Sequence, residues 1–138
     1  MKQAIPGSIS VSTPTILVAD DAEDVRKLIR EFLELDGYAV LEARDGSEAV
    51  QVAERYHGTI HLLITDIEMP GMSGPELARR IASLRPETKV LYISGGAGNA
   101  ALHAGTPGSP GTAFLRKPFG REALARKVRE ALETGKSQ

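Results

Sequence analysis

The sequence predicts an α/β domain built on a single doubly wound, five-stranded parallel sheet with the strand order 2-1-3-4-5. Five short apolar runs alternate with segments of helical periodicity, and this alternation is typical of βαβ units. The first run, residues 15–19, is continuously apolar, which favours a central strand buried on both faces. Carboxylates follow the first and third runs, at Asp20, Asp21 and Asp66, so we expect them to meet where the strand order reverses.

The first half of the chain predicts two strands and two helices. The strands are residues 15–19 and 38–41, and Gly37 between them ends a helix in the way that a C′ glycine does. Residues 45–48, Asp-Gly-Ser-Glu, have the pattern of a capping box that opens the second helix. The apolar positions expected to face the core are Val25, Leu28, Ile29, Phe32 and Leu33 in the first helix, and Ala49, Val52, Ala53 and Tyr56 in the second.

The second half predicts three more strands. The apolar run that begins at residue 60 ends in Asp66, and residues 90–93 and 113–115 form the fourth and fifth strands. Residues 73–76, Ser-Gly-Pro-Glu, are a second capping box, with the proline in the first helical turn. The apolar positions expected to face the core are Leu77, Ile81 and Leu84 in the helix after the third strand, and Leu124, Val128, Ala131 and Leu132 in the last helix.

The segment between the fourth and fifth strands departs from this regular pattern. Residues 95–111 include glycines at six positions and prolines at two. Glycine costs about 1 kcal/mol per helical residue relative to alanine, so we predict a short or irregular fourth helix. We expect a flexible arm over residues 1–14, one domain over residues 15–133, and a polar tail over residues 134–138.

The composition excludes several classes of protein. The 138 residues carry a net charge of −1, which predicts no general attraction to nucleic acid or to an anionic membrane. There is no cysteine, so disulfides and thiolate chemistry are excluded, and a reducing, cytoplasmic compartment fits. No apolar stretch approaches the length of a membrane span, and residues 1–13 lack the apolar core of a secretion signal.

Polar side chains at the predicted strand ends suggest phosphoryl-transfer chemistry. Two unit charges about 4 Å apart repel by roughly 4 kcal/mol at an effective dielectric near 20, so Asp20, Asp21 and Asp66 need cations. Lys117 supplies one positive charge, and an all-oxygen ligand set favours Mg²⁺ for the remainder. Asp66 is then the expected nucleophile, Lys117 and the metal neutralise phosphoryl oxygens, and the Ser94 hydroxyl donates to one of them.

Four motifs in order give the chain a specific resemblance. They are Val-Ala-Asp-Asp at 18–21, Leu-Ile-Thr-Asp-Ile-Glu-Met-Pro-Gly-Met-Ser-Gly at 63–74, Ile-Ser-Gly at 93–95 and Phe-Leu-Arg-Lys-Pro-Phe at 114–119. With these, residues 15–133 resemble the receiver domain of two-component response regulators, which implies a flavodoxin-like fold. Residues 90–95, 113–119 and 124–130 are most similar to the C-terminal receivers of hybrid sensor histidine kinases. The chain is expected to be either a free-standing receiver or an excised domain of such a kinase.

The resemblance implies a role for each site residue. Asp66 resembles the phosphoacceptor, which takes a phosphoryl group from a histidine on a kinase or a histidine phosphotransfer protein. Asp20 and Asp21 resemble the Mg²⁺-binding pair, which the backbone carbonyl of Glu68 would complete together with Asp66. Ser94 and Phe114 resemble the hydroxyl residue and the aromatic residue of the family's switch pair. Lys117 resembles the family's site lysine, which implies a cis peptide bond between Lys117 and Pro118.

Three functions compete at this point. The first is a phosphorylation-switched signalling domain, which is not an enzyme beyond its own phosphorylation and dephosphorylation and which acts on a downstream protein that the sequence does not name. The second is a phosphorylation-independent protein-binding receiver module, and the complete set of Asp20, Asp21, Ser94 and Lys117 argues against it. The third is an aspartate-nucleophile phosphohydrolase, but in those enzymes the nucleophile follows the first strand, and a cap domain is absent here.

Overall fold

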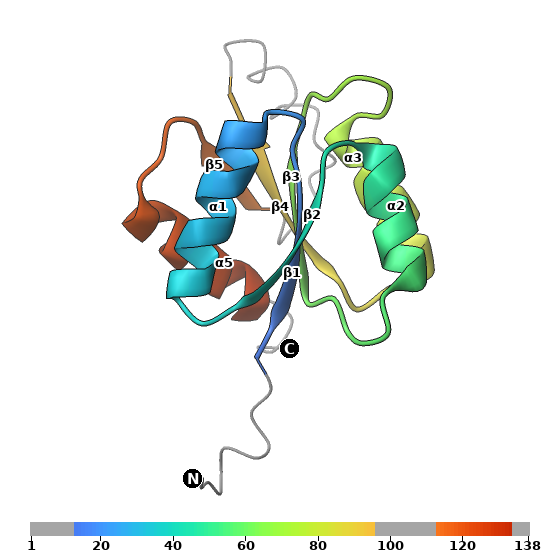
Figure 1. Ribbon diagram of the computed structural model, residues 1–138, viewed down its shortest axis with the longest axis horizontal. Helices are drawn as coiled ribbons and strands as arrows, with labels where there is room; N and C mark the ends of the chain where they lie inside the picture. The colour runs from blue at the N-terminus through green and yellow to red at the C-terminus, as the bar shows by residue number, and fades with distance from the viewer. Residues whose placement is uncertain (1–12, 96–112, 134–138) are drawn as a thin grey trace, which may run out of the picture.

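The five apolar runs form one parallel sheet in the order β2-β1-β3-β4-β5 (Figure 1), as predicted. The computed structural model describes residues 13–95 and 113–133. The strands are β1 (Thr15–Ala19), β2 (Ala39–Ala43), β3 (Leu62–Asp66), β4 (Lys89–Ser94) and β5 (Ala113–Arg116). The helices within the described residues are α1 (Glu23–Leu35), α2 (Gly46–Arg55), α3 (Gly74–Leu84) and α5 (Arg121–Glu133).

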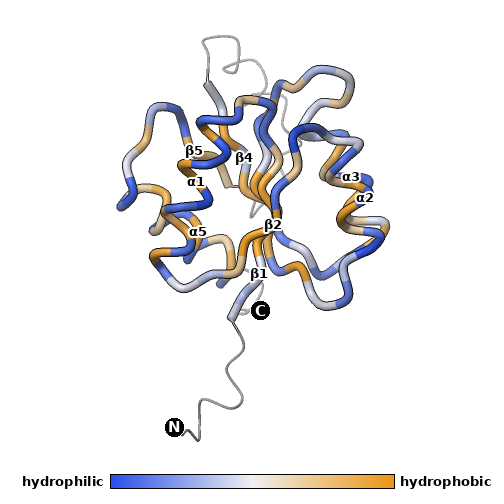
Figure 2. The backbone as a smooth tube through the Cα atoms, viewed as in Figure 1, coloured by the Kyte–Doolittle hydropathy of each residue, from blue (hydrophilic) through white to orange (hydrophobic). Residues whose placement is uncertain are grey.

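Helices cover both faces of the sheet and create two separate cores. Figure 1 shows α1 and α5 on one side and α2 and α3 on the other. Alternate residues of β1 point to opposite faces, so Ile16 and Val18 pack under α1 and α5, whereas Leu17 and Ala19 pack under α2 and α3. The hydrophobic colouring in Figure 2 is concentrated on the strands and on the helix faces that meet them. Every residue of β1 is buried, which confirms the prediction that it is a central strand.

The predicted helix boundaries follow from side-chain and backbone caps. Gly37 has a φ of 93°, and its N–H donates to the Glu34 carbonyl while the Tyr38 N–H donates to Leu33, which is a Schellman motif. The side chains of Asp45 and Ser73 each accept the N–H of the glutamate three residues later, at the start of α2 and α3 respectively.

Two residues predicted to face the core do not. The side chains of Leu28 and Leu84 are 42% and 43% exposed. The buried stripe of α1 is narrower than the periodicity suggested and contains Ile29 and Leu33, with Leu28 turned about 100° away from Ile29. Leu84 ends α3 beyond Ile81, the last residue of that helix that is buried.

Several predictions fall outside the described residues. They are the short or irregular fourth helix, most of the arm over residues 1–14, and the tail over residues 134–138. Within the arm, the Pro14 carbonyl accepts the Ala39 N–H at 3.0 Å, so the pairing of β1 with β2 begins one residue before β1. Over the ranges 13–95 and 113–133, no helix is both long enough and apolar enough to span a bilayer.

Candidate functional site

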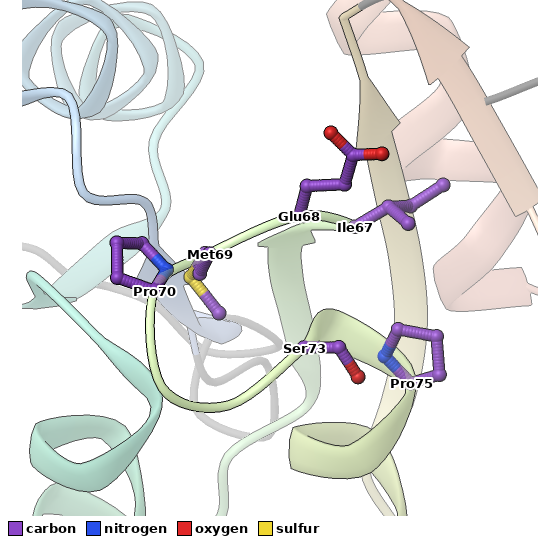
Figure 3. Close-up of a pocket in the computed structure, with 6 residues that line it drawn as sticks. All are labelled: Ile67, Glu68, Met69, Pro70, Ser73 and Pro75. Carbon is purple, nitrogen blue, oxygen red and sulfur yellow. The ribbon is translucent and has the colours of Figure 1, made fainter. Parts of the chain in front are cut away.

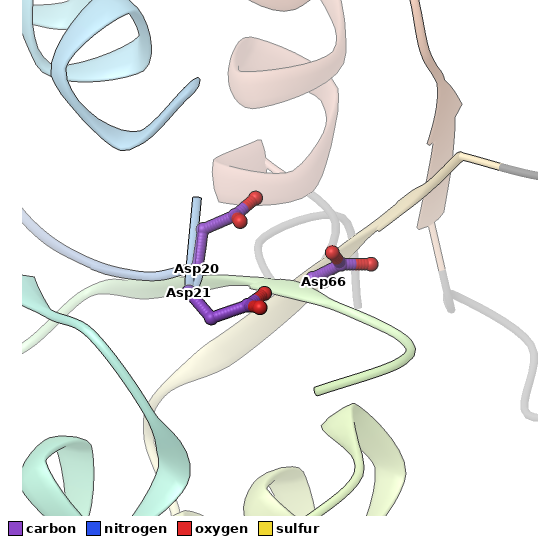
Figure 4. A group of neighbouring side chains, drawn as sticks. All are labelled: Asp20, Asp21 and Asp66. Carbon is purple, nitrogen blue, oxygen red and sulfur yellow. The ribbon is translucent and has the colours of Figure 1, made fainter. Parts of the chain in front are cut away.

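Three aspartates converge at the carboxyl end of the sheet. Asp20 and Asp21 follow β1, and Asp66 is the last residue of β3, the strand that pairs with β1. Figure 4 shows the three side chains as neighbours at this end of the sheet. One oxygen from each lies within 4.8 Å of the others. The sequence prediction that these residues meet at the topological switch point is therefore confirmed.

Lys117 places its ammonium group against two of these carboxylates. Its Nζ atom is 3.3 Å from Asp66 Oδ2 and 3.5 Å from Asp20 Oδ2. The Lys117 backbone N–H donates to the Ser94 carbonyl at 2.8 Å, which ties the loop after β5 to the end of β4. The peptide bond between Lys117 and Pro118 is cis, as the family resemblance implied. The chain thus brings one cation to the aspartate cluster from a residue 51 positions beyond Asp66.

The electrostatics of the cluster are set by the burial of Asp20. Its side chain is 1% exposed, and burial raises its pKa, although the Ala22 N–H and Lys117 act in the opposite direction. Oδ1 accepts the Ala22 N–H at 2.9 Å. Within the described part of the chain Oδ2 has no hydrogen-bond partner, and only the long contact to Lys117 compensates it. For Lys117, burial alone would lower the pKa, but the carboxylates of Asp20 and Asp66 outweigh this and raise it.

This arrangement fits a divalent cation. The donors are three carboxylates from Asp20, Asp21 and Asp66, and one buried oxygen of Asp20 receives no hydrogen bond from any residue that the structure describes. Hard oxygen ligands of this kind suit Mg²⁺, which typically retains waters and uses one or two carboxylates. The Glu68 side chain is exposed, and the Glu68 backbone N–H donates to Asp66 Oδ1 at 3.3 Å. A role for the Glu68 carbonyl as a metal ligand stays a prediction.

The loop from β3 to α3 holds Asp66 by a close backbone approach. Gly74, the first residue of α3, donates its N–H to the Ile67 carbonyl at 2.8 Å. A Cβ atom at Gly74 would lie 2.3 Å from the Asp66 carbonyl oxygen, so a side chain does not fit here. The same loop lines an open hollow of about 450 Å³, whose lining includes Ile67, the residue after Asp66 (Figure 3). The residues around this hollow are Ile67, Glu68, Met69, Pro70, Ser73 and Pro75.

The two predicted switch residues lie on β4 and β5. Ser94 is 1% exposed and follows Ile93, the β4 residue that pairs with Asp66. Phe114 is half-buried and pairs with Tyr92, and the two rings stack with centroids 5.5 Å apart. Ser94 is therefore beside the aspartate cluster, whereas Phe114 is two residues further back along the strands. Their switching role stays a prediction.

Two arginines that the sequence analysis did not single out make structural contacts. Arg26 contacts the backbone at the aspartate cluster, and Arg85 contacts the loop after α2. Arg26 on α1 donates to the Asp20 carbonyl at 2.8 Å and to Glu42 on β2 at 3.0 Å. Arg85 after α3 donates to three backbone carbonyls at the end of α2 and in the following loop. The sequence did contain a signal for Arg26: Glu42 is a charged residue inside an otherwise apolar strand, so it needs a cationic partner. The contacts of Arg85 could not be predicted from the sequence, because every residue has a backbone carbonyl whatever its type.

Comparison with known proteins agrees with this geometry. The family profile described as the response regulator receiver domain matches residues 16–129. The sensor kinase CckA of Brucella abortus (strain 2308) is 35% identical over 119 residues, which are 86% of this chain and 12% of the kinase. The response regulator receiver protein CpdR of the same organism is 34% identical over 117 residues, which are 85% of this chain and 95% of that protein.

Solved structures show the same similarity. The receiver domain of the hybrid histidine kinase CckA has a TM-score of 0.72 and 36% identity, covering 86% of this chain and 98% of that domain. A receiver domain protein from Clostridium thermocellum has a TM-score of 0.75 and 31% identity, covering 89% and 97% of the two chains. This chain spans only 12% and 11% of the sensor kinases CckA and LuxN, the latter from Vibrio campbellii (strain ATCC BAA-1116).

Proposed function

Because this chain belongs to the response regulator receiver domain family, we propose that it is a phosphoacceptor in which Asp66 takes a phosphoryl group from a phosphohistidine. The observation that carries the proposal is the position of Asp66. Its carboxylate shares one space with two further carboxylates, and the Lys117 ammonium lies 3.3 Å from its Oδ2. A nucleophile, a cation and a candidate metal site in contact are the parts that phosphoryl transfer needs.

The transfer step converts one phosphorylated side chain into another. An Asp66 carboxylate oxygen attacks phosphorus, the P–N bond to the donor imidazole breaks, and the imidazole leaves with the electron pair and takes up a proton. The product on this chain is an acyl phosphate. Water attack on phosphorus later releases inorganic phosphate and restores the carboxylate, so the domain returns to its starting state.

The residues around Asp66 are suited to stabilising charge on the transferred group. Lys117 is protonated at neutral pH, because the ordinary pKa of lysine is about 10.4 and the carboxylates of Asp20 and Asp66 raise the pKa here, so its ammonium can neutralise one phosphoryl oxygen. Ser94, buried at the end of β4, offers a hydroxyl on the β4 side of the site. When bound to Asp20, Asp21 and Asp66, Mg²⁺ would supply further neutralisation of the phosphoryl oxygens.

We further propose that phosphorylation changes the affinity of this domain for a downstream protein. The donor would be a histidine kinase or a histidine phosphotransfer protein, and the setting would be cytoplasmic. Ser94 and Phe114 lie on neighbouring strands, so a shift of Ser94 toward a phosphoryl group could be passed to β5. In this proposal the domain is a signalling switch and not a turnover enzyme, because the phosphoryl group is transferred to Asp66 of the domain itself.

The test is the covalent state of the full chain. We expect incubation with acetyl phosphate and Mg²⁺ to add about 80 Da, the mass of one phosphoryl group. The Asp66→Asn variant should lose this addition completely, whereas Glu87→Gln, a change at an exposed carboxylate on the α3–β4 connection, should retain it. A phosphorylated histidine kinase domain should label the same residue.

Three outcomes would contradict the proposal. If neither acetyl phosphate nor a phosphorylated histidine kinase domain modifies the wild-type chain, the result would favour a phosphorylation-independent binding module. An 80 Da addition that survives Asp66→Asn would place the acceptor on another residue. Steady release of phosphate from a phosphomonoester by the unmodified chain would instead indicate a phosphohydrolase.

A further inference from the structure

A partly buried ion-pair network lies next to the aspartate pair. The Arg26 side chain on α1 is 14% exposed, and its Nε donates to Glu42 Oε1 at 3.0 Å. The Arg26 Nη1 atom donates to the Asp20 carbonyl at 2.8 Å. The second carboxylate oxygen of Glu42 accepts Arg30 Nη1 at 2.5 Å. One guanidinium group therefore links α1, β2 and the backbone at the end of β1.

The carbonyl that Arg26 contacts has a special place in the site. It belongs to the peptide group that joins Asp20 to Asp21, the two adjacent candidate metal ligands. A peptide group is planar, so a hydrogen bond to its oxygen helps to fix the plane that contains the Cα atoms of both residues, and this restricts how their side chains leave the backbone. The preceding peptide is held as well, because the Asp20 N–H donates to the Ala43 carbonyl at 3.2 Å.

Arginine is suited to this position in a way that lysine is not. Its planar guanidinium presents Nε and Nη donors in a rigid fork, and here the two donors serve two different acceptors. The hydrogen bond to Glu42 is charge-assisted and fixes the orientation of that fork. The Glu42 side chain is 23% exposed, so water screens the pair less than it would a surface pair. A lysine ammonium carries its three donors on a single nitrogen, so it lacks the separated, rigidly oriented Nε and Nη donors that reach these two acceptors.

We propose that Arg26, held by Glu42, is a positioning residue that orients the Asp20–Asp21 peptide for divalent-cation binding. The inference rests on the proposed function, because it assumes that the aspartate cluster binds Mg²⁺. Arg26 acts on the metal ligands through their backbone and contacts neither the cation nor the phosphoryl group.

The experiment measures Mg²⁺ affinity of the full chain by isothermal titration calorimetry, with urea unfolding in parallel. Arg26→Lys should weaken Mg²⁺ binding by about tenfold, the usual size of an outer-shell effect on a metal site. Arg30→Ala is the matched control, because it removes the other arginine contact to Glu42 and leaves the Asp20 carbonyl bond intact. It should keep the Mg²⁺ dissociation constant within about twofold of wild type. If the substitutions acted only through a general loss of stability, both variants would lose unfolding free energy and their Mg²⁺ affinities would not differ.

The outcomes distinguish this inference from the function on which it rests. Wild-type affinity in Arg26→Lys, or an equal loss in Arg30→Ala, overturns the positioning role and leaves the proposed function standing. A wild-type chain that binds no Mg²⁺ overturns both. If Arg26→Lys does not fold, Glu42→Gln replaces it: weakened Mg²⁺ binding supports the role, and unchanged binding overturns it.

Discussion

Replacing Asp20 with asparagine should make the metal-free protein more stable at neutral pH. Asp20 is 1% exposed, and its Oδ2 lacks a hydrogen-bond donor within the described residues. The amide would keep an oxygen for the Ala22 N–H, which Asp20 Oδ1 now accepts at 2.9 Å. The change therefore removes a buried charge without removing that hydrogen bond.

The charges around Asp20 nearly cancel. At an effective dielectric near 20, Lys117 at 3.5 Å attracts the Asp20 carboxylate by about 5 kcal/mol. Asp66, within 4.8 Å, repels it by about 3.5 kcal/mol, and exposed Asp21 adds about 1 kcal/mol at the dielectric of water. The desolvation of the buried carboxylate is then offset mainly by the Ala22 N–H, a hydrogen bond that the amide would keep. Because that penalty is several kcal/mol per buried ion, and the amide has desolvation costs of its own, we expect a net gain of about 1–2 kcal/mol.

The pH dependence gives a second signature. Burial raises the folded-state pKa of Asp20, so the folded protein holds this proton more tightly than the unfolded chain does. The contribution of the protonated Asp20 to the unfolding free energy is fully present below about pH 3.9, the ordinary aspartate pKa. It is lost as the pH rises through the folded-state pKa of Asp20. The advantage of Asp20→Asn should therefore be largest at neutral pH and disappear as the solution is acidified toward that value.

Urea unfolding at several pH values, in EDTA and in Mg²⁺, measures these effects. In EDTA at pH 7 the midpoint of Asp20→Asn should rise by about 1 M. Asp21→Asn, at an exposed member of the same cluster, is the control and should change the midpoint much less. Mg²⁺ should stabilise wild type more than Asp20→Asn. A less stable Asp20→Asn protein at pH 7, or a gain that persists unchanged at pH 4, would refute the electrostatic reasoning.

Three further predictions concern the framework around the site. Gly74→Ala should lower the unfolding free energy by about 3 kcal/mol, because its Cβ would lie 2.3 Å from the Asp66 carbonyl oxygen. Gly120→Ala should not, because a Cβ there would have no atom of the described residues within 4 Å apart from its chain neighbours, and equal urea midpoints for the two variants would contradict this. Arg85→Met should cost about 2–3 kcal/mol by leaving three carbonyls without their donor, and a loss below 0.5 kcal/mol by urea unfolding would argue that water replaces it. The His61 ring should carry its proton on Nε2, because Nδ1 accepts the Thr15 N–H at 2.9 Å, and ¹⁵N-edited NMR showing the Nδ1–H form would contradict the geometry.

The sequence predicted the sheet well because strand signals are local. A continuous apolar run at residues 15–19 requires burial on both faces, and β1 is central and fully buried. Helix burial was predicted less well. Periodicity places Leu28 on the same broad face as Ile29, but which part of that face meets the sheet depends on the rotation of α1 about its axis. That rotation is decided by packing against α5 and the strands, which no single segment encodes.

The same distinction explains which parts of the site were predictable. Strand ends were the signal for the site residues, because parallel strands bring their carboxyl ends to one edge of the sheet. Asp66 and Ser94 end their strands, and Asp20 and Lys117 directly follow theirs. Topology alone therefore gathers them. Arg26 lies on a helix face, and its contact with the Asp20 carbonyl depends on side-chain reach and on the position of α1 over β2. The chemical groups of a site at strand ends can thus be predicted from a sequence, while the side chains that orient those groups require the packed structure.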